Sequence, residues 1–157
     1  MNDVKAIPDG MTAVTPHLIF DDANGAIEFY KAAFGAEERY RMVAPGTDLI
    51  LHAEIVIGGA VVMLGQHNPD WETQSPKDLG GSPAFVHLYV EDVDAFQARA
   101  VAAGATEAMP VADMFWGDRM GKIVDPHGYS WSIGTHVADP TPEEMEAGMQ
   151  AMMGGGG

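Results

Sequence analysis

The feature that most constrains the fold of this chain is an internal repeat. Residues of the first half recur in the second half at a shift of 70 positions, which becomes 69 after a one-residue deletion. A repeat must be recognised first, because missing it leads to the wrong fold. The constant shift indicates a duplicated module. The matches are His17-Leu18 with His87-Leu88 and Asp22 with Asp92 at the first shift, then Gly35-Ala36 with Gly104-Ala105, Glu38 with Glu107 and Gly59 with Gly128 at the second.

The residue pattern within each copy predicts one strand, one helix and three more strands. In the first copy, Asp22 is an N-cap before an apolar stripe at helical spacing, and Gly35 ends that helix. Asp92 and Gly104 do the same in the second copy. The expected module is therefore βαβββ, an α+β arrangement. The expected strands are residues 13–20, 38–43, 49–57 and 60–64, then 84–90, 106–114, 118–124 and 129–134.

These patterns also predict the boundaries of a single domain, residues 12–139. Module 1 covers about 12–65, module 2 about 84–139, and the linker 66–83 is rich in Pro, Gly and polar residues. Trp71 is the one linker residue expected to pack against the modules. Residues 1–11 form an N-terminal arm, and residues 140–157 form a C-terminal helix and a Gly tail.

The C-terminal segment opens on a capping box, Thr141-Pro142-Glu143-Glu144, with proline at the first helical position. A short helix through Met145 and Met149 should follow. The methionine-rich end beyond it is expected to fray, and docking on a partner subunit is the alternative.

The most distinctive motif is a hairpin over residues 115–136. It contains the run Phe115-Trp116-Gly117-Asp118-Arg119 and the turn Asp125-Pro126-His127-Gly128, which suits a type I turn. This hairpin resembles the closing hairpin of the glyoxalase/bleomycin resistance/dioxygenase (vicinal oxygen chelate) superfamily, and most of all its PhnB-like branch. The resemblance implies two tandem βαβββ modules that form a curved mixed sheet with a concave cavity.

Composition excludes several classes of function. The net charge of −15 argues against nucleic acid and anionic membrane surfaces, which need a basic footprint. There is no cysteine, so thiol chemistry and disulfides are excluded. No apolar run reaches the length of a membrane span, and the N-terminus shows no signal peptide, so we expect a cytoplasmic protein.

Strand alternation predicts which side chains leave the core. His17, His52 and Glu54 should share one face in module 1, and Phe85, His87, Tyr89 and Ser132 the equivalent face in module 2, with Trp131 in the core. By resemblance to the family, this face lines the cavity. Trp116 and Arg119 are further candidates, because an aromatic ring beside a planar cation suits an anionic or aromatic ligand. The predicted substrate-binding residues are His17, His87, Phe85, Tyr89, Trp116, Arg119 and Ser132.

Alternatives remain for several of these residues. His52 and Glu54 could form a polar pair on a solvated face, and Arg119 could instead pair with Asp118 or Asp125. His127, at the tip of a turn, is expected to be exposed, whereas His136 has equal chances of a structural and a functional role.

The metal positions of the family are not kept. The resemblance aligns them with Thr15, Met63, Phe85 and Ser132, none of which is a strong ligand. His17, His87, Glu54 and His52 are the candidates for a displaced site that would hold Zn, Fe, Mn or Ni. We predict no tightly bound metal and no other cofactor.

The leading hypothesis is a PhnB-like protein that binds a small organic molecule in its cavity. One rival is a divalent-metal lyase, isomerase or dioxygenase using His17, His87 and Glu54 or His52, and another is a drug-sequestering protein without catalysis. Nucleophilic catalysis has no support, because no serine has an evident base and oxyanion hole. We expect a homodimer, because the superfamily usually covers the open cavity with a second copy.

Overall fold

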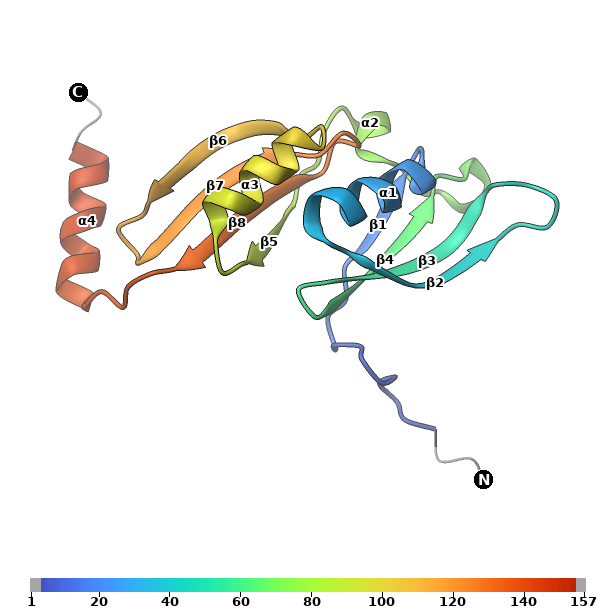
Figure 1. The fold of residues 1–157 in the computed structure, drawn as a ribbon, viewed down its shortest axis with the longest axis horizontal. Helices are drawn as coiled ribbons and strands as arrows, with labels where there is room; N and C mark the ends of the chain where they lie inside the picture. The colour runs from blue at the N-terminus through green and yellow to red at the C-terminus, as the bar shows by residue number, and fades with distance from the viewer. Residues whose placement is uncertain (1–3, 155–157) are drawn as a thin grey trace.

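The computed structural model describes residues 4–154 and consists of two βαβββ modules arranged side by side (Figure 1). Each module contains one four-stranded mixed sheet and one helix of ten or twelve residues. The predicted α+β architecture is therefore confirmed in both copies. None of the helices within residues 4–154 is long and apolar enough to span a membrane.

Module 1 has the strand order β1-β4-β3-β2. Strand β1 pairs with β4 in parallel, and the other neighbours are antiparallel. Its elements are β1 (His17–Phe20), α1 (Ala23–Phe34), β2 (Glu37–Val43), β3 (Ile50–Ile57) and β4 (Ala60–Gln66).

Module 2 repeats this topology in the order β5-β8-β7-β6, again with the first and last strands parallel. Its elements are β5 (Phe85–Tyr89), α3 (Val93–Ala102), β6 (Thr106–Asp113), β7 (Asp118–Val124) and β8 (Ser130–His136). A 3₁₀ turn, η1 (Pro69–Trp71), and the short helix α2 (Pro76–Leu79) lie in the linker, and α4 (Pro142–Gly154) follows module 2.

Both module helices begin at the caps that the sequence predicts. The Oδ1 atom of Asp22 accepts the backbone N–H of Gly25 at 2.9 Å, and Asp92 does the same for Ala95 at 3.0 Å. Gly35 ends α1 with a φ of 65°, a left-handed conformation that glycine adopts without steric cost. The repeat is therefore preserved in the geometry of the N-caps, whereas α3 ends at Ala102 with Ala103 as its cap, one residue before the predicted Gly104.

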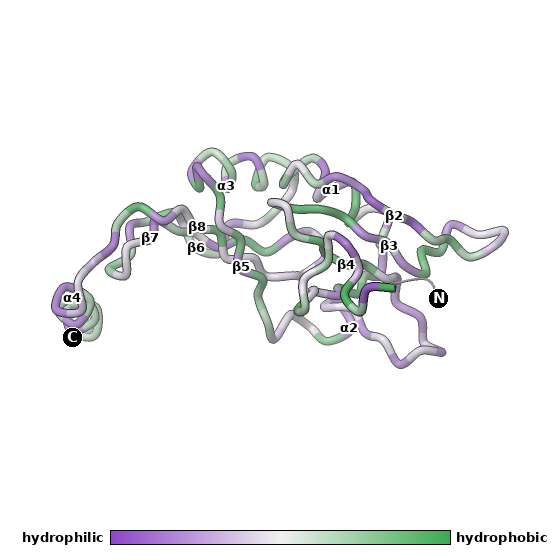
Figure 2. The backbone as a smooth tube through the Cα atoms, turned by 90° about the horizontal axis from the view of Figure 1, so that it is seen from below, coloured by the Kyte–Doolittle hydropathy of each residue, from purple (hydrophilic) through white to green (hydrophobic). Residues whose placement is uncertain are grey.

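Helices α1 and α3 contact each other and lie on the same side of the two sheets (Figure 2). Their inner faces and the sheets enclose one continuous core. Aromatic rings join the modules there: the Phe34 ring lies 4.8 Å from Trp131 and 5.2 Å from Phe96, between centroids. Trp131 is in the core, as predicted.

A buried carboxylate, Asp125, also links the modules. Its Oδ2 atom accepts the hydroxyl of Tyr30 from α1 at 2.5 Å and the indole N–H of Trp131 at 3.1 Å. Its Oδ1 atom accepts the backbone N–H groups of His127 and Tyr129 at 2.9 and 3.0 Å. Burial first, and then the neighbouring Asp125, raise the pKa of Tyr30 well above its usual value. Asp125 therefore fixes the turn and ties module 1 to it.

The turn at residues 125–128 forms as predicted, but its tip is buried and not exposed. The backbone N–H of Gly128 donates to the Asp125 carbonyl at 3.0 Å, and Gly128 has a φ of 95°. His127 is only 7% exposed, so the expectation of an exposed turn tip is wrong. Its ring packs edge-on against Phe20 of β1, with centroids 5.6 Å apart, because module 1 covers the tip.

The linker packs through a different residue from the one predicted. Trp71 is 53% exposed, whereas Ser75 is fully buried and Pro76 is buried against the Gly128 turn. The reason is the capping box of α2, in which Ser75 and Asp78 satisfy each other's polar groups and so allow this segment to be buried.

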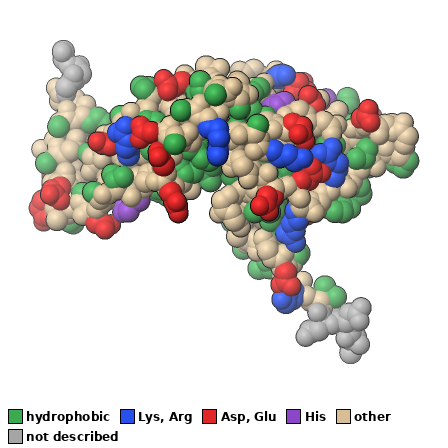
Figure 3. All heavy atoms as spheres, in the orientation of Figure 1, with side chains coloured by type: hydrophobic (Ala, Val, Ile, Leu, Met, Phe, Trp, Pro, Cys, Tyr) green, Lys and Arg blue, Asp and Glu red, His purple; other side chains and the backbone are tan. Residues whose placement is uncertain are grey.

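The C-terminal helix α4 extends over 13 residues and begins at the predicted capping box. None of its described side chains is buried, and in Figure 1 it stands apart from both sheets. Basic side chains on the helix-bearing face lie beside acidic ones (Figure 3), as in the ion pairs Arg41–Glu38 and Arg119–Asp94.

Candidate functional site

Each sheet has a face that α1 and α3 do not cover, and in module 2 this open face carries the candidate side chains. Val86 and Leu88 of β5 pack on the core, which places Phe85, His87 and Tyr89 on the other face. Strand β8 lies beside β5, with His87 in register with Ser132. The His87 Nδ1 atom is 2.8 Å from the Ser132 hydroxyl, so the ring is held in place through one nitrogen and Nε2 remains available.

Two large aromatic side chains on this face are exposed to solvent. Phe85 is 60% exposed and Tyr89 is 59% exposed. The rings of His87 and Tyr89 are perpendicular, with centroids 4.5 Å apart, and the ammonium of Lys122 lies 5.3 Å from the Phe85 ring centroid. The arrangement presents aromatic rings, an imidazole and a cation together.

Both modules place their first-strand histidine over a glycine of the last strand. A Cβ on Gly65 would lie 3.4 Å from His17 Nε2, and a Cβ on Gly134 would lie 3.4 Å from His87 Cε1. The two glycines differ by 69 positions, the second repeat shift, so the sequence itself contains a signal for this pair of positions.

The open face of module 1 carries a row of polar groups. His17 and His52 stand edge to face with ring centroids 5.7 Å apart, and His52 Nε2 is 3.4 Å from a carboxylate oxygen of Glu54. Burial first, and then the charge of His52, lower the pKa of His17. Glu54 also lies 3.6 Å from the guanidinium of Arg39. The polar pair expected for His52 and Glu54 is therefore present.

A second constellation in module 2 is centred on Asp118, which is only 5% exposed. Its Oδ2 atom accepts the Tyr89 hydroxyl at 3.0 Å and the Trp116 indole N–H at 3.2 Å, and its Oδ1 atom accepts Nδ1–H of His136 at 2.9 Å. The other ring nitrogen of His136 donates to Asp139 at 3.0 Å.

The titration of this constellation follows from its hydrogen bonds. Burial acts to raise the pKa of Asp118, but the hydrogen bonds from His136, Tyr89 and Trp116 outweigh it and keep that pKa below its usual value. The hydrogen bonds to Asp118 and Asp139 raise the pKa of His136. Both ring nitrogens of His136 therefore face carboxylates, an arrangement that favours the protonated ring.

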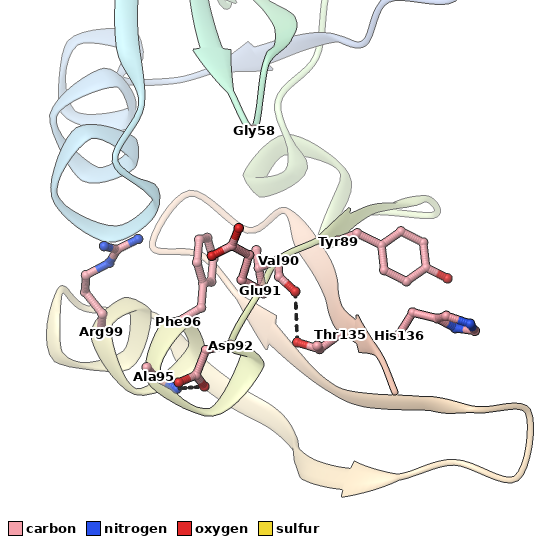
Figure 4. Close-up of a pocket in the computed structure, with 10 residues that line it drawn as sticks. All are labelled: Gly58, Tyr89, Val90, Glu91, Asp92, Ala95, Phe96, Arg99, Thr135 and His136. Atoms are coloured by element: carbon pink, nitrogen blue, oxygen red, sulfur yellow. Dashed lines mark hydrogen bonds between the residues drawn. The ribbon is translucent and has the colours of Figure 1, made fainter. Parts of the chain in front are cut away.

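His136 and Tyr89 also line a pocket of about 1090 Å³ at the junction of the two modules (Figure 4). Gly58, in the turn between β3 and β4, lines it from module 1, and a Cβ at this position would lie 3.4 Å from Leu88 of β5. Phe96 and Arg99 of α3 form the wall next to α1. In Figure 4 the Tyr89 and His136 side chains extend in the same direction, away from α3.

Comparison with known proteins agrees with this architecture. The family model of the Glyoxalase/Bleomycin resistance protein/Dioxygenase superfamily matches residues 12–133. The chain belongs to this superfamily. An uncharacterized protein of Mycobacterium tuberculosis is 43% identical over 142 residues, which cover 88% of this chain and 83% of that protein. An uncharacterized protein of Arabidopsis thaliana is 30% identical, over 92% of this chain and 97% of that one.

Solved structures with the same fold include two further proteins. TioX from Micromonospora sp. ML1 has a TM-score of 0.63 at 28% identity, covering 80% of this chain and 99% of TioX. A PhnB protein from Bacillus cereus has a TM-score of 0.59 at 20% identity, covering 79% of this chain and 99% of that one. Likeness at that lower identity establishes the fold alone.

The superfamily's metal positions, as aligned above, carry side chains that do not suit a metal. The Thr15 hydroxyl donates to the Thr12 carbonyl, Ser132 is engaged with His87, and Met63 and Phe85 contribute a thioether and a phenyl ring. Within residues 4–154, no three His, Asp or Glu side chains are grouped so that they could hold a metal ion. The residues present therefore do not fit the superfamily's metal site.

The structure does not bring Arg119 together with the other predicted site residues. Arg119 lies on the helix-bearing face of β7, where its guanidinium donates two hydrogen bonds of 2.7 Å to Asp94 of α3 and one of 3.0 Å to Asp113. The alternative pairings with Asp118 and Asp125 were wrong, because strand alternation turns Arg119 away from Asp118. Trp116, in contrast, reaches the Asp118 constellation.

Proposed function

We propose that this chain is a PhnB-like member of its superfamily that binds a small organic molecule on the open face of module 2. Phe85, Tyr89 and Trp116 would contact its apolar part. His87, positioned by Ser132, would offer Nε2 as a hydrogen-bonding group, and His17 would contribute from module 1.

The exposure of Phe85 and Tyr89 is the observation on which this proposal rests. These two rings lie on the same face of β5 with His87 between them, and each is more than half exposed. Exposed aromatic surface of this kind gains free energy when a ligand covers it. Their polar neighbours His87, Ser132 and Lys122 supply the few oriented polar groups that such sites use for specificity.

We further propose that a second copy of the chain completes the site. Strands β1 and β5 are sheet edges, and the open faces of both modules leave candidate residues in solvent. A symmetric dimer would cover these edges and bring an open face of each chain toward the other. His17 of one copy would then approach Phe85 and Tyr89 on the open face of module 2 in the other copy.

One observation favours a second candidate, a divalent-metal enzyme. His17 stands edge to face with His52, and His52 faces Glu54. A metal bridging two chains could therefore use His17 with Glu54 or His52 from one copy and His87 from the other. A fosfomycin resistance protein, FosX, from Listeria monocytogenes was solved with manganese(II) and is 18% identical to this chain, with a TM-score of 0.59. That likeness extends to the fold alone.

Protein-observed NMR with benzamide, a neutral aromatic probe, tests the proposal. We expect shifts in β5 and β8 and saturable binding. Phe85→Ala and Tyr89→Ala should each weaken binding about three- to tenfold, because ring–ring contacts contribute about 0.5–1.5 kcal/mol. Trp71→Ala is the matched control, since Trp71 is also more than half exposed but lies in the linker. Equal effects of all three variants, or the absence of saturable binding, would refute the proposal.

A further inference from the structure

We propose that the Nε2–H group of His136 is the binding site for a carboxylate carried by the ligand, and that Asp139 occupies this donor when no ligand is bound. The inference rests on the proposed function, because it assigns an acidic arm to the aromatic molecule expected on the open face. It defines the ligand class as aromatic carboxylates.

The two partners of His136 differ in how firmly they are held. Asp118 is buried and accepts three hydrogen bonds, so Nδ1 of His136 is committed to it. The Asp139 side chain is 98% exposed, and its one hydrogen bond, to Nε2, is surrounded by water. An exposed ion pair of this kind contributes little and is easily exchanged.

The backbone beside Asp139 allows such an exchange. The N–H groups of Val137 and Ala138 both donate to the Gly117 carbonyl, at 2.9 and 3.0 Å, which anchors the segment just before Asp139. Only the Asp139 side chain has to rotate away for a ligand carboxylate to take its place. The imidazolium would keep its orientation, since Asp118 holds the other nitrogen.

The position of His136 relative to Tyr89 selects an aromatic acid. Both residues line the same pocket, are bridged by Asp118, and extend in the same direction (Figure 4). The Tyr89 side chain is 59% exposed and that of His136 is 52% exposed, so one ligand can reach both. A ligand whose aromatic ring packs against Tyr89 could therefore place its carboxylate next to His136.

Because of the charges around His136, a ligand carboxylate would have to be recognised by a direct hydrogen bond from Nε2. Asp118 and Asp139 face it, and Glu91, Asp92 and Arg99 line the same pocket. Because most of these charges are negative, the local potential does not attract anions. Recognition would depend on replacing one carboxylate by another at Nε2, a charge-assisted hydrogen bond that a neutral amide cannot match.

The experiment compares benzoate with benzamide, two probes that share a ring and differ in charge. NMR titration at pH 6 should show benzoate binding about five- to tenfold more tightly than benzamide, since hydrogen bonds to charged groups exceed neutral ones. The advantage should fall as the pH rises and His136 deprotonates. The ¹⁵N shift of His136 Nε2 should change with benzoate and not with benzamide.

Three variants make the test specific. Asp139→Asn removes the competing carboxylate and should tighten benzoate about two- to fivefold while leaving benzamide unchanged. His136→Gln should abolish the preference for benzoate. Asp70→Asn is the matched control, because it removes the same charge from an exposed position in η1.

The outcomes separate this inference from the proposed function. If benzamide binds and benzoate binds no better, the proposed binding on the open face of module 2 is supported and the carboxylate site is refuted. An equal effect of Asp139→Asn and Asp70→Asn would also refute it, since only net charge would matter. If neither probe binds, both proposals fail. If His136→Gln does not fold, the benzoate affinity of Asp139→Asn and the ¹⁵N shift of His136 Nε2 are sufficient to test the carboxylate site.

Discussion

Replacing Tyr30 by phenylalanine tests whether the Asp125 network joins the two modules. The ring of Tyr30 is fully buried, so Tyr30→Phe keeps its packing and removes only the hydroxyl that donates to Asp125 at 2.5 Å. A hydrogen bond to a charged group contributes about 1.5–3 kcal/mol. Asp125 retains its bonds from Trp131 and two backbone N–H groups. We therefore expect a loss of about 2 kcal/mol in the free energy of unfolding.

The pH dependence of stability provides an independent check. The pKa of Tyr30 is raised above the unfolded value of about 10. Its contribution to stability is therefore fully present below about pH 10 and is lost as the pH rises above it. The Tyr30→Phe variant lacks this group, so its stability should fall less between about pH 10 and pH 11 than that of the wild type.

Urea unfolding followed by far-UV circular dichroism measures both effects. Tyr40→Phe is the matched control, because Tyr40 is 50% exposed on β2 and its hydroxyl should contribute little. A loss below about 0.5 kcal/mol for Tyr30→Phe, or equal alkaline sensitivity in the variant and the wild type, would show that Asp125 does not depend on Tyr30. The carboxylate would then be satisfied by the turn alone.

Three further predictions address the turn, the assembly and the metal. Gly128→Val should destabilise by about 1–3 kcal/mol, because φ is 95° and a Cβ would lie 2.9 Å from Pro76; an unchanged urea midpoint would contradict this. Sedimentation at tens of micromolar should give a homodimer, and a stable monomer would count against the composite site. Untagged protein should contain no stoichiometric metal by elemental analysis; one equivalent per chain, lost in both His17→Ala and His87→Ala, would favour the metal enzyme.

Much of the fold could be predicted from the sequence because the decisive signals are local. Asp22 and Asp92 cap helices, Gly35 ends one, and the repeat shift relates the two modules. These signals depend on residues close together in the chain. The burial of His127 could not be predicted in this way, because it depends on Phe20, which approaches from the other module.

The candidate site was predictable only where strand alternation decides the outcome. Alternation placed Phe85, His87 and Tyr89 on one face, as the structure shows. It also separates Asp118 from Arg119, and applying it to that strand would have excluded Arg119 from the face. The Asp118–His136 contact was missed because the two residues meet only through the antiparallel register of β7 and β8.

Comparison of equivalent positions in the two modules explains why module 2 is the better candidate for the site. The histidine over a glycine is common to both, at His17 and His87. The neighbours have diverged: Glu54 pairs in register with Met63 in module 1, whereas Lys122 pairs with Ser132 at the equivalent position. Ser132 positions its histidine through a hydrogen bond, which the thioether of Met63 cannot match.

The residues that lie in register with Gly65 and Gly134 also differ between the modules. Ile19 lies in register with Gly65, and Tyr89 lies in register with Gly134. Tyr89 adds an aromatic ring and a hydroxyl that reaches Asp118, so the oriented histidine and the Asp118 constellation share the open face of module 2. The two modules share the histidine over a glycine, but the oriented polar and aromatic groups that a ligand requires come together on the open face of module 2.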